Sequence, residues 1–220
     1  MDIYLEGGKS GFRLYDQTAE GSYYYVMSTP PHKTLQVKQF LEENGIEAIV
    51  PLNYQDVVRR GKTSRELVSV LDNKVYIKAD LTKIRWIKKY LPYLTYVKVE
   101  EYDGKWKKYR VYIENEIIEL FRLLEANYLN DLLIVTSDDI SDDNFTQIYT
   151  KDGIFKDIPL FFENVKGVDH KCLTITLDYS TVIAVRSLTL ESFMIQECEM
   201  TQVVDGEFHK TYFPVAKVAN

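Results

Sequence analysis

Side chains that could carry catalytic or metal chemistry are few in this sequence and lie far apart. The three histidines, His32, His170 and His209, belong to no pattern such as HExxH, and the two cysteines, Cys172 and Cys198, form no CxxC pair. A serine, histidine and aspartate triad can assemble in space without a local pattern, but the sequence has no nucleophile elbow. We therefore expect no enzyme activity, no cofactor and no metal site. A hydrolase that uses His170 or His209 is the remaining enzymatic alternative.

Two short segments resemble ligand-binding loops only superficially. Residues 8–10 read Gly-Lys-Ser, but the first glycine of a phosphate-binding loop would fall at Ile3, and no strand is predicted before it. The run SDDISDDN at residues 137–144 lacks the glycine and the distal glutamate of a calcium loop. Neither segment predicts a ligand site, and the acidic run is typical of a solvated linker.

Clustered basic side chains are the more informative chemistry. Four cations follow one another closely on a predicted hairpin, and two further basic residues lie at the start of the first predicted helix. Such groups can neutralise the phosphates of a single nucleic-acid strand. A solvated basic face is the alternative, and it applies equally to a second basic stretch with Trp106 at residues 105–110. The candidates for nucleic-acid binding are Arg59, Arg60, Lys62, Arg65, His32 and Lys33.

Length, composition and charge restrict the class of protein. The 220 residues are 45% hydrophobic and 27% charged, which excludes disorder and indicates one large domain or two small ones. No apolar run is long enough for a membrane helix, and the first residues lack the apolar stretch of a signal peptide. We expect a cytoplasmic monomer without membrane association, and the low cysteine content fits a reducing compartment.

The charge is distributed unevenly along the chain. Residues 23–126 hold 18 basic and 14 acidic side chains, a net charge of +4, whereas residues 127–220 hold 7 and 15, a net charge of −8. This asymmetry predicts two modules with different partners, because clustered charge favours encounters with oppositely charged surfaces. Two ordinary solvated surfaces are the alternative interpretation.

The elements that must position these residues form an α/β pattern in residues 23–126. The run YYYVMST predicts a strand that Pro30 and Pro31 terminate, and short β-rich runs separated by Gly61 indicate hairpins. The second helix has Asp80 or Thr82 as its N-cap. This order favours an antiparallel sheet covered on one face by helices. Apolar spacing predicts the helices at residues 33–44, about 80–91 and about 114–126.

The remaining segments are predicted to be simpler. Residues 1–22 are expected to form a flexible arm or a loosely added strand, and residues 127–144 an acidic linker. Residues 145–196 alternate apolar and polar positions as five short strands, which suits a small β-barrel. Residues 197–220 are expected to be either a tail or an added hairpin. The expected strands lie near residues 147–151, 159–165, 172–178, 182–185 and 192–196.

Residues 23–126 contain, in order, the segments YYYVMST, KTLQVKQFLEENGIE, AIVPL, VVRRGKTSREL, LVSVLDNKVYIKAD, TKIRWIKKYLPYL and IENEIIELFRLLE. Together these segments resemble the N-terminal domain of NusG-type transcription elongation factors. The resemblance is closest to the UpxY-like antiterminators of capsular polysaccharide operons. It extends into the second module, where IYTKDGIFKD resembles the KOW motif of the family's SH3-like barrel. Gly153, Phe155 and Lys156 match that motif. Asp157 and Leu160 stand where the family usually has glycines.

The resemblance implies an α+β protein that binds the clamp helices of RNA polymerase and suppresses pausing and termination. Contact with the non-template DNA strand would be a second interaction. A free-standing nucleic-acid-binding module is the alternative, although the net charge of −8 in the second module disfavours it. A helix pair needs buried apolar anchors, while the alternative role for each such residue is in the core of the sheet. By position in the family, the anchors are Val70, Leu71 and Val75, with Tyr24 and Tyr76 beside them.

Overall fold

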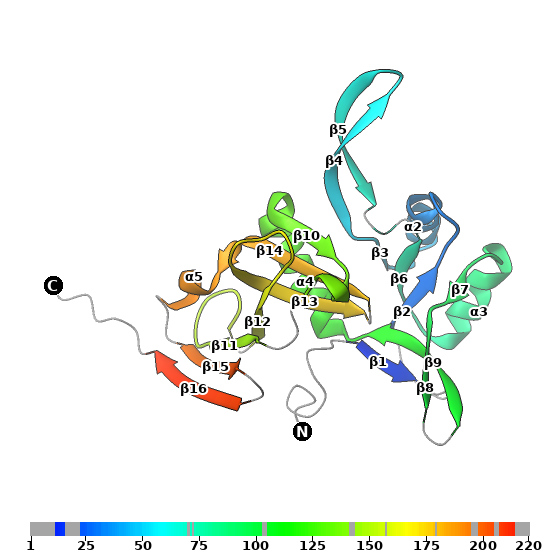
Figure 1. Ribbon diagram of the computed structural model, residues 1–220. Helices are drawn as coiled ribbons and strands as arrows, with labels where there is room; N and C mark the ends of the chain where they lie inside the picture. Colours follow the sequence, from blue (N-terminus) through cyan, green and yellow to red (C-terminus); the bar gives the residue numbers. More distant parts are fainter. Residues whose placement is uncertain are drawn as a thin grey trace. The chain divides into compact units, whose positions relative to one another are not determined.

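The computed structural model divides into two compact units, the first ending at Arg122 and the second beginning at Leu123. Both units combine antiparallel sheets with few helices, which confirms the α+β class (Figure 1). The division lies close to the boundary expected after Ala126. The structure describes residues 12–15, 23–69, 71, 73–102, 105–140, 144–156, 158–178, 180–194, 198–204 and 207–213.

The first unit is built on an antiparallel sheet whose main strands run in the order β1-β9-β2-β6-β3. The central strand β2 ends at Ser28, just before the two prolines, as predicted. Part of the N-terminal segment joins the sheet, because β1 pairs with β9. The strands are β1 (Phe12–Tyr15), β2 (Tyr23–Ser28), β3 (Ala48–Ile49), β6 (Lys74–Ala79), β7 (Thr95–Tyr96), β8 (Lys98–Tyr102) and β9 (Trp106–Ile113).

Three helices accompany this sheet, at the positions that the apolar spacing predicts. They are α2 (Thr34–Glu43), α3 (Leu81–Tyr90) and α4 (Asn115–Tyr128). The buried stripes of α2 and α3 pack against one face of β2 and β6. Alternate residues of a strand point to opposite faces, so Tyr25 and Met27 face these helices while Tyr24 and Val26 face the other way. The core of this face includes Tyr25, Met27, Val37, Leu41, Val75, Ile77, Ile84 and Ile87.

Asp80 is the N-cap of α3, and its side chain accepts a hydrogen bond of 2.7 Å from the backbone N–H of Lys83. We expect Asp80→Ala to lower the free energy of unfolding by about 1 kcal/mol, because that N–H loses its partner. Urea unfolding monitored by circular dichroism would measure the change. Thr82→Ala is the matched control, and an equal loss in both variants would contradict the capping role.

A long hairpin forms a separate two-stranded sheet in the first unit. It consists of β4 (Leu52–Arg59) and β5 (Lys62–Ser69), and Figure 1 shows it extending away from the main sheet of its unit. Arg60 and Gly61 connect the strands with φ values of 53° and 75°. Positive φ at both central residues is the requirement of a type I′ turn, whose twist matches that of the paired strands.

The second unit is a seven-stranded antiparallel sheet in the order β10-β14-β13-β12-β11-β15-β16. Strands β11 to β14 form a meander, and β15 returns to pair with β11 on its other side. The short helix α5 (Leu190–Met194) lies between β14 and β15. The strands are β10 (Leu132–Val135), β11 (Thr146–Thr150), β12 (Pro159–Asn164), β13 (Lys171–Asp178), β14 (Thr181–Thr189), β15 (Cys198–Val204) and β16 (Glu207–Phe213).

Three expectations for this unit are corrected. The described strands form no closed barrel: closure would require β14 to meet β15, but β10 and β16 already pair with those two edges. Residues 127–144 are not merely a linker, because their apolar run Leu132–Val135 forms β10. The strand expected at residues 192–196 is replaced by α5, where leucine, glutamate and methionine favour a helix. For residues 197–220, the hairpin alternative is confirmed by β15 and β16.

Candidate nucleic-acid interface

The tip of the β4–β5 hairpin gathers the four hairpin cations predicted to bind nucleic acid. Arg59, Arg60, Lys62 and Arg65 are all exposed. Strand register places Arg59 directly opposite Lys62, so both point to one face, whereas Arg65 points to the other. The tip therefore presents positive charge on both faces of a projecting ribbon.

Two of these cations have partners within the hairpin. Arg59 Nη2 lies 2.9 Å from Glu66 Oε2, and the Arg65 guanidinium lies 5.6 Å from the centre of the Tyr54 ring. An exposed ion pair contributes little to stability and is readily exchanged for another anion. Among the described residues, Arg60 and Lys62 form no ion pair. Arg60 lies in the turn and Lys62 directly follows it, and these two cations are the most available to a phosphate.

The two other predicted nucleic-acid residues lie on a different element, just before α2. His32 has a φ of 63° and is exposed. Lys33 is also exposed, and its Nζ donates a hydrogen bond of 3.0 Å to Gln36 Oε1 in the first turn of the helix. The structure therefore divides the six predicted residues between the hairpin tip and the start of α2.

The predicted polymerase anchors are largely buried. Val75 is 0% exposed and belongs to the core beneath α2 and α3, so it cannot face a partner. Tyr24 and Tyr76, on the opposite face of the sheet, are 2% and 0% exposed. Leu71 is half-buried after β5, and Val70 lies outside the described residues. Strand alternation distinguishes the two faces, but it does not reveal that both are covered.

Tyr24 belongs to a polar network that ties α4 to this opposite face. Its hydroxyl donates a hydrogen bond of 2.6 Å to Glu47 Oε1, which also pairs with Arg122 of α4. Lys78 Nζ lies 3.6 Å from Glu47 Oε2. Burial alone would raise the pKa of Glu47, but the Tyr24 hydrogen bond and the two cations lower it below its ordinary value. Burial and the Glu47 carboxylate raise the pKa of Tyr24. This network serves structure, since its groups satisfy one another.

The second basic stretch contributes one side chain whose surroundings the structure describes well. The Arg110 guanidinium of β9 lies 4.4 Å from the centre of the Tyr96 ring on β7. Lys88 Nζ of α3 lies 5.1 Å from the same ring. That α3 contributes a cation here could not be predicted from the sequence, because the helix and β9 are separated along the chain.

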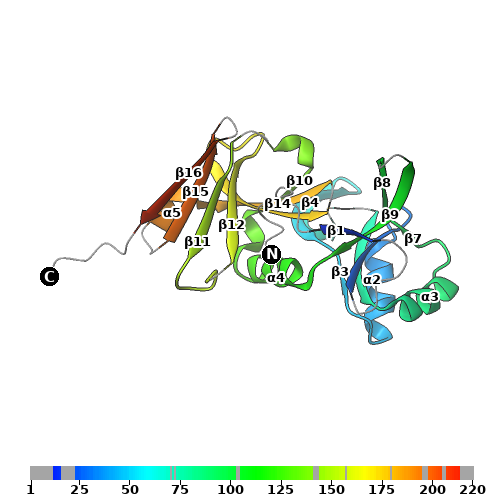
Figure 2. The ribbon, with the colours of Figure 1, turned by 90° about the horizontal axis from the view of Figure 1, so that it is seen from below.

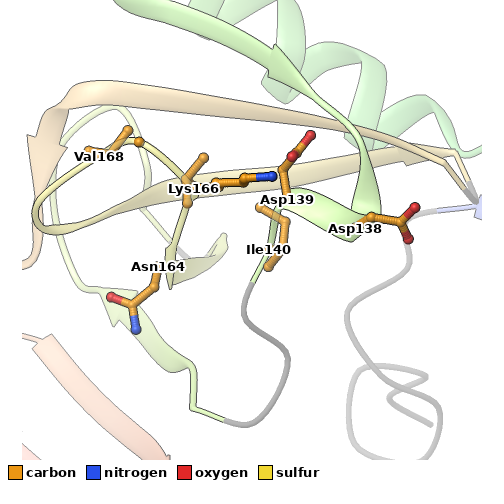
Figure 3. A pocket seen from close by; sticks show the side chains of 8 residues that line it. Asp138, Asp139, Ile140, Asn164, Lys166 and Val168 are labelled. Atoms are coloured by element: carbon orange, nitrogen blue, oxygen red, sulfur yellow. The ribbon is translucent and has the colours of Figure 1, made fainter.

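The second unit contains a hollow that bears on the hydrolase alternative. An open hollow of about 410 Å³ is lined by residues 138–140 and 164–168 (Figure 3). Hydrogen bonds from Thr136 lower the pKa of Asp139 there, and the side chain of Lys166 points toward Asp139 in Figure 3. Neither His170 nor His209 lines this hollow. Burial raises the pKa of the Cys172 thiol to about 11, which keeps it protonated and unreactive at neutral pH.

Within the part of the chain that the structure describes, no group of three or more histidine, cysteine or acidic side chains is placed to hold a metal ion. None of the helices described here has the length and apolar character to cross a membrane. A comparison with models of protein families finds none that matches this sequence, and a comparison with curated proteins also finds no match.

Proposed function

We propose that this chain is a transcription elongation and antitermination factor that acts by binding, in the manner of NusG-type proteins. The observation that carries the proposal is the projecting, cationic β4–β5 hairpin on an α/β unit that is followed by a separate β unit. The second unit is an open antiparallel sheet in which β15 returns to pair with β11 after the four-stranded meander. The ordered sequence resemblance supports the same assignment.

In this proposal the factor binds the clamp helices of RNA polymerase and the exposed non-template strand together. A protein that binds both only when the clamp is closed shifts the equilibrium away from the open, paused state. Because Val75, Tyr24 and Tyr76 are buried, Leu71 is the predicted anchor, among the described residues, that remains for the apolar contact. The hairpin supplies the cations for the strand.

The hairpin contribution can be measured with Arg60→Gln/Lys62→Gln. In transcription in vitro on the leader of a surface-polysaccharide operon, we expect wild type to reduce pausing and this variant to lose most of that effect. Binding to single-stranded DNA should weaken about tenfold at low salt, because two phosphate contacts are lost. Lys38→Gln/Lys83→Gln removes the same charge from α2 and α3 and is the control. Unchanged pausing with wild type present would contradict the proposal.

Capture of purified RNA polymerase tests the apolar contact separately. We expect Leu71→Asp to reduce capture strongly, because a charged group replaces an apolar anchor. Tyr54→Asp is the control: it introduces the same charge at Tyr54, an exposed hydrophobic side chain of β4, and should leave capture nearly unchanged. Undiminished capture by Leu71→Asp would remove the proposed anchor.

A free-standing nucleic-acid-binding module is the second candidate, and the exposed cations of the hairpin favour it. It requires strong, salt-dependent affinity for naked DNA or RNA without any polymerase. The net charge of −8 in residues 127–220 opposes such binding by the second unit. Tight binding to naked nucleic acid, combined with no capture of polymerase, would replace the first proposal with this one.

A further inference from the structure

Four cations belong to elements next to Tyr96, on the side of the first unit where α3, β7, β8 and β9 lie together (Figures 1 and 2). Lys88 and Arg110 both contact the Tyr96 ring, as described above. Lys98 of β8 is directly opposite Arg110 in the strand register. Arg85 lies near enough to Tyr96 to act on its hydroxyl electrostatically. We call Arg85, Lys88, Lys98 and Arg110 the Tyr96 cation cluster.

The cluster is electrostatically unbalanced. Like charges directly opposite each other on paired strands are destabilising, and Lys98 and Arg110 have that relation. Among the described residues, no carboxylate forms an ion pair with any of the four cations. Burial raises the pKa of Tyr96, while Arg110 and Arg85 act to lower it, so the phenol remains neutral and does not supply the missing negative charge at neutral pH. An unfavourable arrangement of this kind is expected where an external anion binds.

The four side chains come from three elements held by the sheet and its helix. Tyr96 is fixed by its pairing with Met27 of β2 and by an edge-to-face contact of 6.0 Å with Tyr25. Its ring in turn orients Lys88 and Arg110 by cation–π contact. Two of the cations are guanidinium groups, whose planar donors suit phosphate oxygens.

We infer that the Tyr96 cation cluster is a phosphate-binding site, distinct from the hairpin tip. The ligand is a phosphate group of a nucleic-acid strand or a free phosphate compound. The site does not depend on the proposed role in transcription, because any phosphate group that can reach the four cations would balance their charge.

The test uses the full chain with the hairpin already neutralised as Arg60→Gln/Lys62→Gln. We expect Arg85→Gln/Lys98→Gln, added to this background, to weaken binding of a fluorescent oligothymidylate of about 15 nucleotides by about 5- to 10-fold. The slope of log affinity against log salt should fall by about 0.7 for each cation lost. Both replaced side chains are exposed, and circular dichroism would establish that the variant is folded. Lys38→Gln/Lys83→Gln is the charge-matched control and should change affinity less than twofold.

A second readout distinguishes the two sources of phosphate. In the hairpin-neutralised background, inorganic pyrophosphate should shift the NMR amide signals of Tyr96 and Arg110 when the cluster is intact and when the control substitutions are added. It should not shift them when Arg85→Gln/Lys98→Gln is added. Such shifts without any selective loss of oligonucleotide binding would support the site and identify free phosphate as its ligand. Equal loss of affinity in the cluster and control variants, without these shifts, would overturn the inference. Because the hairpin is neutralised throughout, failure of the proposed function is measured separately.

Discussion

Replacing Phe162 by alanine should lower the free energy of unfolding by about 3–5 kcal/mol, the largest effect expected for a single substitution considered in this chain. Phe162 lies on β12 between β11 and β13 and is 0% exposed. Its ring meets Phe193 of α5 edge to face at 5.2 Å, and Phe193 lies 5.7 Å from Phe155. Truncation removes apolar contacts from both the sheet and the helix, and leaves a cavity that the paired strands cannot close.

Urea unfolding monitored by circular dichroism measures this loss as a lower midpoint with an unchanged slope. Ile154→Ala is the control, because Ile154 is 54% exposed and its truncation should change the free energy of unfolding by less than about 0.5 kcal/mol. A loss below about 1 kcal/mol for Phe162→Ala would show that this ring is not packed as described. A changed slope would indicate that the unit no longer unfolds in one step.

Glu47→Gln is expected to cost about 2 kcal/mol at neutral pH, the second large effect. Glu47 accepts a hydrogen bond from Tyr24 and faces the cations of Arg122 and Lys78. Hydrogen bonds to a charged group contribute about 1.5–3 kcal/mol, and the lower part of this range applies because the Glu47 side chain is 35% exposed to screening solvent. A neutral amide of the same shape keeps the packing but leaves two cations without their counter-charge.

The pH dependence of this difference has a definite sign. The folded protein lowers the pKa of Glu47 from its ordinary value of 4.5, so the folded state favours the ionised carboxylate. The stabilisation is fully present above that ordinary value and is lost as the pH falls through the lower pKa of the folded state. Wild type and Glu47→Gln should therefore differ most above pH 5 and converge in more acidic solution.

Urea midpoints of both proteins, measured from neutral pH to about pH 3, would reveal this convergence. Glu43→Gln is the matched control: its exposed carboxylate accepts a hydrogen bond from Gln39 within α2, and its replacement should matter little at any pH. A difference between wild type and Glu47→Gln that persists unchanged at acid pH would contradict the role of the ionised carboxylate.

The burial of Tyr24 and Tyr76 bears directly on the proposed polymerase contact. In the described structure these rings are enclosed, and Arg122 of α4 reaches Glu47 on their side of the sheet. A partner that required Tyr24 would first have to break its hydrogen bond to Glu47. Contact with the exposed hairpin cations requires no such rearrangement.

Local sequence determined the elements whose signals are local. The apolar spacing of Val37 and Leu41, the capping by Asp80 and the terminating prolines after β2 predicted where helices and strands begin and end, because capping and periodicity act within a turn or two. The hairpin around Gly61 was predicted for the same reason, since a left-handed turn residue specifies its own geometry.

Only the tertiary structure decided which faces are covered and which edges are paired. Alternation along β6 separates Val75 from Tyr76 but cannot show that both sides of the sheet are buried, because burial depends on segments outside the strand, such as α2 on the Val75 side. In the open sheet of the second unit, β10 pairs with β14, and this pairing joins residues about fifty positions apart in the sequence. The Tyr96 cation cluster likewise exists only because folding brings α3, β8 and β9 to one tyrosine.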